Sequence, residues 1–181
     1  FFVPDSTPLQ KISRIKYFCG NNCELIINGN NFDESLKISK EFTKNKNMIF
    51  IHPFDDIDVI EGQSWIAKEI CNELNPDIIL ASIGGGELIS GIISHLEDCN
   101  TLNSINCGVY GKEPIGAASM HKSLEQNEIV TLDNIYIFVD GASVSRVGKL
   151  TFDFAQTQQL KDIFKICNGE LCTELINLYQ N

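Results

Sequence analysis

Three consecutive glycines, Gly84–Gly86, are the residues whose type and spacing are best suited to binding a ligand. They separate a continuous apolar stretch, Asp77–Ile83, from an amphipathic stretch, Glu87–Glu97. Glycine allows positive φ angles and a close approach of backbone to ligand, and a helix start presents unpaired N–H groups to an anion. The pattern therefore predicts a phosphate-binding turn. From these three residues alone, a plain tight turn between strand and helix is an equally good interpretation.

The remaining chemistry-bearing residues form no pattern of their own. The glycines are contiguous and no lysine follows them, which excludes the dinucleotide motif GxGxxG and the Walker motif GxxxxGK[ST]. The seven cysteines are scattered without a CxxC pair or zinc spacing, so we expect neither a disulfide scaffold nor a metal site. They indicate a reducing, intracellular compartment. His52, His95 and His121 are dispersed, and no nucleophile–base pattern is evident.

Composition and charge narrow the class of protein. The 181 residues are 43% hydrophobic and 21% charged, which is typical of a soluble globular domain and not of a disordered, collagenous or membrane chain. The net charge is −10 with no cluster of basic residues, so a nucleic-acid partner is not expected. No apolar stretch approaches the roughly 20 residues of a membrane span, so no membrane partner is expected.

Short apolar segments alternate with segments of helical period, which predicts βαβ units on a mostly parallel sheet. The expected strands are Leu25–Ile27, Met48–Ile51, Asp77–Ile83, Ile105–Tyr110, Ile135–Val139 and Ile163–Cys167. The expected helices are one from Phe32, then Gly62–Leu74, Glu87–Glu97, Ala117–Glu125, Lys149–Gln159 and a last one to Tyr179. The strand Asp77–Ile83 is apolar throughout, so we expect it to be buried on both faces.

Several segments, in chain order, resemble the pyridoxal-phosphate-dependent threonine dehydratases of the tryptophan-synthase-β fold type, fold type II. The segments are Val3–Lys11, Gly29–Glu34, the His52–Asp56 turn with Val59–Gln63, Ile83–Gly91, Gly108–Val109 with Ala117–Met120, and Asp140–Phe152. The resemblance covers essentially the whole chain. It implies an α/β fold with a mostly parallel twisted sheet and helices on both faces.

The resemblance also implies a cofactor, pyridoxal 5'-phosphate. Its phosphate would be held by Gly84, Gly85, Gly86, Glu87 and Leu88, which match the family's Gly-Gly-Gly-Gly-Leu loop. Glu87 replaces the fourth glycine and places a carboxylate beside a phosphate, which weakens binding unless the side chain turns to water. Trp65 replaces a small residue near the same loop, and it either repacks the pocket or points outward. No metal ligands are assigned.

The resemblance further implies that the chain is a fragment. Residues 1–46 would be a remnant of the small N-terminal subdomain, and residues 47–181 the large cofactor-binding subdomain, incomplete at its C-terminus. The family's Schiff-base lysine and the serine facing the pyridine nitrogen match no residue here. We therefore expect no catalytic residue in this chain, no activity of the chain alone, and a homo-oligomer in the intact parent.

The function implied is threonine dehydratase, which converts L-threonine to 2-oxobutanoate and ammonia in branched-chain amino-acid (isoleucine) biosynthesis. The substrate would be a small amino acid, L-threonine or L-serine, in the cytoplasm or, in a eukaryote, a mitochondrion or plastid. Two alternatives stay open. One is a degenerate, non-catalytic paralogue that acts as a binding or regulatory subunit, and the other is a serine dehydratase or serine racemase.

Overall fold

The computed structural model describes residues 1–103 and 107–180, and it divides into two compact units, Phe1–Ile51 and His52–Asn181. Each unit has its own parallel sheet. None of the described helices combines the length and the apolar composition that crossing a bilayer requires. The α/β class and the parallel pairing of the strands expected from the sequence are confirmed.

The first unit pairs two short parallel strands with two helices. Its elements are β1 (Phe2–Val3), α1 (Leu9–Cys19), β2 (Ile26–Ile27) and α2 (Phe32–Asn45). The Asn31 side chain caps α2 by accepting the Glu34 N–H at 2.9 Å, while the Glu34 carboxylate accepts the Asn30 N–H at 2.9 Å. These reciprocal bonds explain why the helix begins at Phe32, as expected.

The expected strand Met48–Ile51 is wrong, because these residues have no strand pairing in the described part of the chain. The α2 helix ends at Asn45, and the left-handed backbone of Asn47 (φ 51°) turns the chain away from it. Ile49 is 90% exposed, so an apolar, strand-like sequence lies here without a neighbouring strand. The helix α1 was not expected, because its exposed apolar residues obscure the helical period.

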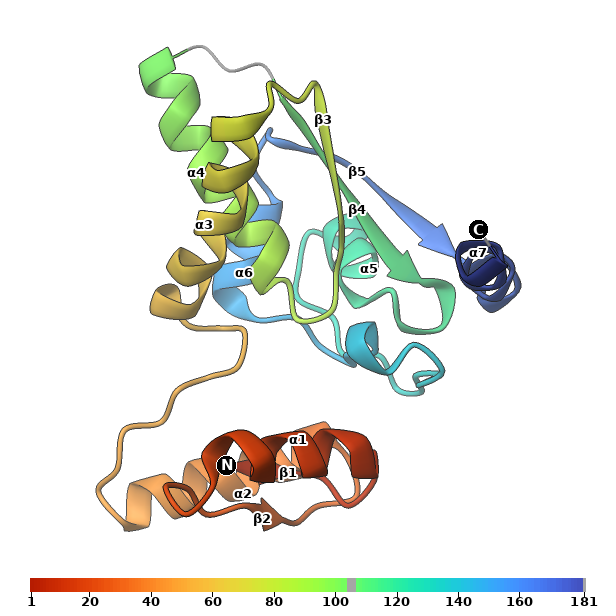
Figure 1. Ribbon diagram of the computed structural model, residues 1–181. Helices are drawn as coiled ribbons and strands as arrows, with labels where there is room; N and C mark the ends of the chain where they lie inside the picture. Colours follow the sequence, from red (N-terminus) through yellow and green to blue (C-terminus); the bar gives the residue numbers. More distant parts are fainter. Residues whose placement is uncertain (104–106, 181) are drawn as a thin grey trace. The chain divides into compact units, whose positions relative to one another are not determined.

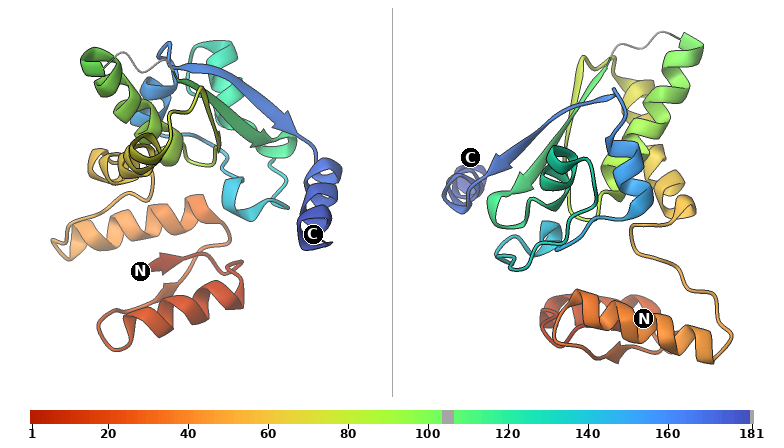
Figure 2. Two further views of the ribbon diagram at one scale, coloured as in Figure 1. Left: turned by 45° about the horizontal axis from the view of Figure 1, so that its top comes forward. Right: turned by 180° about the vertical axis from the view of Figure 1, so that it is seen from behind.

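The second unit contains a three-stranded parallel sheet in the order β3-β4-β5 (Figure 1). The strands are β3 (Ile78–Ser82), β4 (Gly108–Pro114) and β5 (Leu160–Ile166). The helices are α3 (Ile57–Glu73), α4 (Glu87–Asn103), α5 (Ser119–Gln126), α6 (Lys149–Ala155) and α7 (Asn168–Gln180), with single 3-10 turns at Ile115–Ala117 and Asp140–Ala142. The α7 helix lies beyond the end of β5 (Figure 2), and none of its residues is buried.

The core of this unit lies against one face of the sheet. Alternate residues of β3 point into it, with Ile79 7% and Ala81 7% exposed, whereas Ile78 and Leu80 are 60% and 49% exposed. The expectation that this strand is buried on both faces is wrong.

The helices α3, α4 and α6 supply the apolar partners of the buried face, among them Ala67, Ile89, Ile93 and Phe152. On the opposite face, the half-buried ring of Tyr110 stacks on the exposed ring of Phe164, with ring centroids 5.8 Å apart.

Other helices and strands begin or end at residues that differ from those expected from the sequence. The α3 helix begins at Ile57, ahead of the expected Gly62, because the Asp56 carboxylate caps it by accepting the Asp58 N–H at 3.0 Å. Part of the expected strand Ile105–Tyr110 lies outside the described residues, and β4 continues from Gly108 to Pro114. The expected strand Ile135–Val139 is wrong. Its Tyr136 N–H donates to the Gly116 carbonyl at 2.9 Å, which holds the segment in an exposed loop.

The helices α3 and α4 lie close together at Gly91. A Cβ built there would lie 2.7 Å from backbone atoms of Ile60, Gln63 and Ser64, which have little freedom to move. Gly62, also within α3, has nothing within 4 Å of its Cβ position. The two glycines are therefore a matched pair, one required by packing and one not.

We expect Gly91→Ala to lower the free energy of unfolding by about 2 to 3 kcal/mol, because the two helices must separate to admit the methyl group. Gly62→Ala should raise it by up to about 1 kcal/mol, because alanine favours an exposed helix interior. Urea unfolding monitored by circular dichroism measures both. Equal effects of the two substitutions would contradict the close helix approach.

Candidate functional site

The glycine turn Gly84–Gly86 leaves the carboxyl end of β3 and enters α4. The Ile83 N–H donates to the Lys112 carbonyl at 2.8 Å, so pairing with β4 continues up to the turn. In parallel α/β sheets, ligands bind in the crevice beyond the carboxyl ends of the strands. The turn therefore lies where this fold class binds its ligands.

The turn presents a group of backbone N–H donors. The Ser90 N–H donates to the Gly86 carbonyl at 3.0 Å, within the first turn of α4. Over the described ranges 1–103 and 107–180, no acceptor is found for the N–H groups from Gly84 to Leu88. Since α4 runs for 17 residues, the partial positive charge of its N-terminus adds to these donors. The arrangement suits an anion with several acceptor oxygens, such as a phosphate.

Two of the glycines have no room for a side chain. Gly86 has a φ of 102°, and a Cβ there would lie 2.8 Å from Cβ of Thr151 and 3.0 Å from Cε of Met120. A Cβ on Gly85 would overlap the ring of Phe54. Side chains from three distant segments therefore pack directly beneath the turn, and only glycine fits there.

One of these segments is the turn that follows His52. The His52 Nδ1 accepts the N–H groups of Asp55 at 2.9 Å and of Phe54 at 3.3 Å. His52 is therefore a structural hydrogen-bonding residue of this turn. The turn also reaches α6, because Asp55 Oδ1 accepts the Leu150 N–H at 2.8 Å. The acidic residues of this turn therefore bind backbone N–H groups.

The start of α6 contacts the glycine turn through a hydroxyl group. Thr151 is fully buried, and its Oγ1 lies 2.8 Å from the Gly85 carbonyl and 3.3 Å from the Gly148 carbonyl. Phe54, Asp55 and Thr151 were not identified from the sequence as residues that support the loop. They lie within segments that resemble the threonine dehydratases, and that resemblance was the one signal pointing to them.

Glu87 and Leu88 complete the expected loop. Both are half-buried in the first turn of α4, and Leu88 packs against the hydrophobic core. Glu87 is not among the described residues with positive φ, so its Cβ introduces no backbone strain. What remains of the predicted conflict is the negative charge that Glu87 carries in the first turn of α4, directly after the three glycines.

Trp65 does not fill a pocket in the second unit. Its side chain is 56% exposed on α3, and the Lys68 ammonium lies 3.8 Å from the ring centroid. Of the two interpretations left open for this residue, the outward orientation is the observed one.

Glu113 supports the site from β4. It is 1% exposed, and its carboxylate oxygens accept the N–H groups of Met120 at 2.9 Å and His121 at 2.8 Å. Burial raises the pKa of this carboxyl to about 7, although the two N–H groups and the charge of Lys165 lower it. The contact fixes the start of α5, and with it the Met120 side chain beneath Gly86. Among the described residues, no group of three or more metal-ligating side chains is placed to hold an ion.

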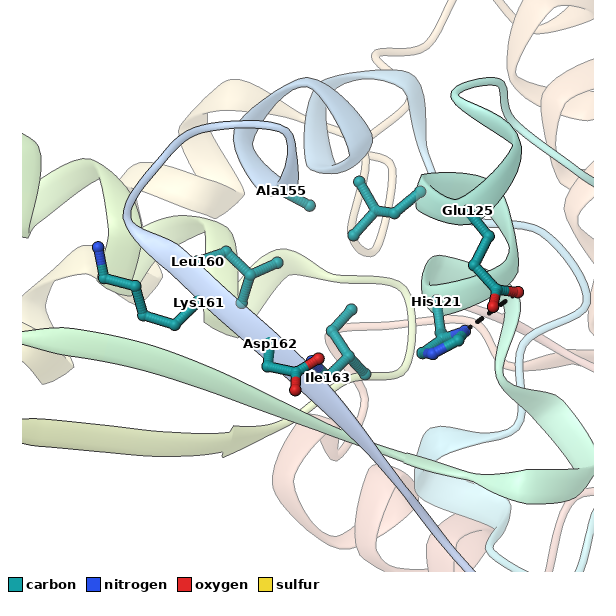
Figure 3. A pocket seen from close by; sticks show the side chains of 8 residues that line it. His121, Glu125, Ala155, Leu160, Lys161, Asp162 and Ile163 are labelled. Carbon is teal, nitrogen blue, oxygen red and sulfur yellow. Dashed lines mark hydrogen bonds and ion pairs between the residues drawn. The ribbon is translucent and has the colours of Figure 1, made fainter.

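A separate cavity of about 230 Å³ lies between α5, α6 and β5 (Figure 3). It is lined by His121, Leu124, Glu125, Ala155, Leu160, Lys161, Asp162 and Ile163. His121 Nδ1 lies 3.4 Å from a Glu125 oxygen, and the side chain of His121 is 20% exposed. Because the cavity includes the first residues of β5, it lies near the amino ends of the strands and not at the glycine turn.

The parallel α/β sheet and its glycine turn agree with a comparison of the whole chain. A family profile described as "Pyridoxal-phosphate dependent enzyme" matches residues 1–169. The chain belongs to the pyridoxal-phosphate-dependent enzyme family.

Within that family, the chain is similar to threonine dehydratases. It is 41% identical to the biosynthetic L-threonine dehydratase of Staphylococcus saprophyticus over 184 residues, which cover 98% of this chain and 42% of the relative. The processed form of threonine deaminase isoform 2 from Solanum lycopersicum superposes with a TM-score of 0.85 at 31% identity, over 98% of this chain and 50% of that one. Serine racemase from Dictyostelium discoideum superposes with a TM-score of 0.78 at 26% identity, over 98% and 54%. The chain thus spans about half or less of the length of these relatives.

The raised pKa of Glu113 predicts a pH dependence of stability. The folded state keeps the proton up to about pH 7, whereas the unfolded state loses it near the ordinary value of 4.5. Between these values the folded state binds more protons, so the free energy of unfolding falls as pH rises, by on the order of 3 kcal/mol. Glu113→Gln should remove this dependence of the free energy of unfolding on pH.

The measurement is urea unfolding at pH 4.5, 5.5, 6.5 and 7.5. Both proteins should carry His121→Gln, so that the neighbouring imidazole does not titrate. Parallel pH profiles for the two proteins would show that Glu113 ionises in the folded state as it does in water.

Proposed function

We propose that Gly84, Gly85, Gly86, Glu87 and Leu88 bind the phosphate of pyridoxal 5'-phosphate, in a protein that converts L-threonine to 2-oxobutanoate and ammonia. One observation carries the proposal: the N–H groups of this turn have no acceptor among the described residues. The turn lies at the carboxyl end of a parallel sheet and at the start of the 17-residue helix α4. The glycine positions fit the group, because a Cβ at Gly85 or Gly86 would collide with the supporting side chains.

The cofactor, when bound, supplies an electron sink that stabilises negative charge at the substrate Cα. The part of this chain is binding and orientation. Its N–H groups hold the phosphate oxygens, and the packing of Phe54 and Thr151 beneath the turn keeps those donors in place. A rigid anchor at the phosphate fixes the position of the rest of the cofactor.

Similarity favours L-threonine as the substrate, since the dehydratase of Halalkalibacterium halodurans is also 39% identical over 98% of this chain. A serine racemase or serine dehydratase is the second candidate, supported by the superposition on the Dictyostelium enzyme. The third is a non-catalytic subunit, which the carboxylate of Glu87 favours because it opposes phosphate binding. The outward position of Trp65 takes away the other argument for that third candidate.

The division into subdomains is part of the same proposal. Residues 1–46 would belong to a small subdomain and residues 47–181 to the cofactor-binding one, in an intact homo-oligomer. The chain alone would contribute no catalytic residue, because no lysine in it has the family's sequence context. Cytoplasm, mitochondrion and plastid are the proposed compartments.

The full-length protein that contains this chain tests the reaction. With pyridoxal 5'-phosphate, we expect 2-oxobutanoate from L-threonine at a higher kcat/KM than pyruvate from L-serine, measured by reduction of each keto acid. D-serine as the main product would identify a racemase instead. If the protein binds the cofactor but forms neither a keto acid nor D-serine, it is the non-catalytic alternative.

Replacing Glu87 tests the charge conflict at the turn. Two unit charges about 4 Å apart repel by roughly 4 kcal/mol at an effective dielectric of 20, and solvent reduces this to about 1 kcal/mol. Because Glu87 has no positive φ, we expect Glu87→Gln and Glu87→Gly to tighten cofactor binding alike, by about five- to tenfold at low salt.

The cofactor Kd of the full-length protein and of both variants is measured at low and high salt. High salt should reduce the difference, since screening weakens the repulsion. Tightening by the glycine variant alone would show that the side chain obstructs the phosphate by its bulk. No change in either variant would mean that the carboxylate points into water.

A further inference from the structure

We propose that Thr151 is a positioning residue that selects the orientation of the Gly85–Gly86 peptide and thereby aims the Gly86 N–H at a bound phosphate. The proposal rests on the proposed function of the turn. It assigns a role to a residue that lies 66 positions away in the sequence and contacts the turn from the opposite side of the peptide.

The geometry of one peptide unit carries the inference. Thr151 Oγ1 donates to the Gly85 carbonyl at 2.8 Å, which holds this oxygen toward α6 and the core. The C=O and N–H of a planar trans peptide point in opposite directions. The Gly86 N–H, which belongs to the same unit, is therefore directed away from Thr151 and out of the core.

This peptide needs an external constraint because it lies between two glycines. A peptide reverses by coupled changes in ψ of the residue before it and φ of the residue after it, here Gly85 and Gly86. With no Cβ on either side, both orientations are sterically accessible. In the reversed orientation a carbonyl oxygen would face the phosphate, and the two negative groups would repel each other.

The Thr151 hydroxyl is itself held in place. It is fully buried, and its single proton lies nearer the Gly85 carbonyl, at 2.8 Å, than the competing Gly148 carbonyl, at 3.3 Å. The Asp55 carboxylate accepts the N–H of the preceding residue, Leu150, and fixes the first turn of α6. The hydroxyl therefore meets the Gly85 carbonyl at a fixed position, as a positioning group requires.

The test uses the ¹⁵N,¹³C-labelled full-length protein that contains this chain, with inorganic phosphate as the probe. Thr151→Val removes the hydroxyl and keeps the shape, and Thr151→Ser keeps the hydroxyl. Thr157→Val is the matched control, because the buried Thr157 hydroxyl has no partner among the described residues. Without phosphate, the Gly85 carbonyl ¹³C signal reports the hydrogen bond directly. With phosphate, the Gly86 N–H signal reports binding.

We expect Thr151→Val to shift the Gly85 carbonyl signal upfield and to weaken phosphate binding by about three- to tenfold, the effect of one hydrogen bond. Thr151→Ser and Thr157→Val should behave like the wild type. Equal phosphate affinity of Thr151→Val and the wild type would overturn the role of Thr151 and leave the phosphate site standing. If phosphate does not change the N–H chemical shifts of the turn in the wild type, the phosphate site itself is overturned, and the positioning role with it.

Discussion

The second unit depends on the close approach of separate backbone segments at Gly85 and Gly86. The ring of Phe54, the hydroxyl of Thr151 and the methyl group of Met120 all occupy the space that side chains on these residues would need. The approach brings the His52–Asp56 turn, α5 and α6 together beneath one strand-to-helix connection. The N–H groups of the same connection have no acceptor among the described residues, so the packing that stabilises the turn also holds a group of unpaired donors in place.

Local patterns predicted this connection and could not predict what supports it. The apolar run before Ser82, the three glycines and the helical period after Glu87 are adjacent in the sequence, and the structure has β3, the turn and α4 there. The bond between Asp55 and the Leu150 N–H joins residues 95 positions apart. The hydrophobic periodicity of the sequence gives no information about a contact over such a distance in the chain. Without a resembling family, the sequence would have suggested only a solvated acidic turn.

The wrong expectations about strands and about the burial of β3 have a common physical origin. An apolar segment becomes a strand only where a neighbouring strand is available, and Met48–Ile51 and Ile135–Val139 have none among the described residues. The two faces of β3 are similar in sequence, yet one is buried and the other open, because burial depends on the layers packed around the strand. Hydrophobicity shows that a segment can be buried, whereas burial itself depends on the neighbours that the fold supplies.

The two hydrogen bonds accepted by His52 make the support of the turn dependent on a protonation state. Its Nδ1 can accept the N–H groups of Phe54 and Asp55 only while the imidazole is neutral and carries its proton on Nε2. A second proton on the ring would place a donor against two donors and remove both bonds. The support of Gly85 at its Phe54 side therefore requires one particular protonation and tautomeric form of the His52 ring.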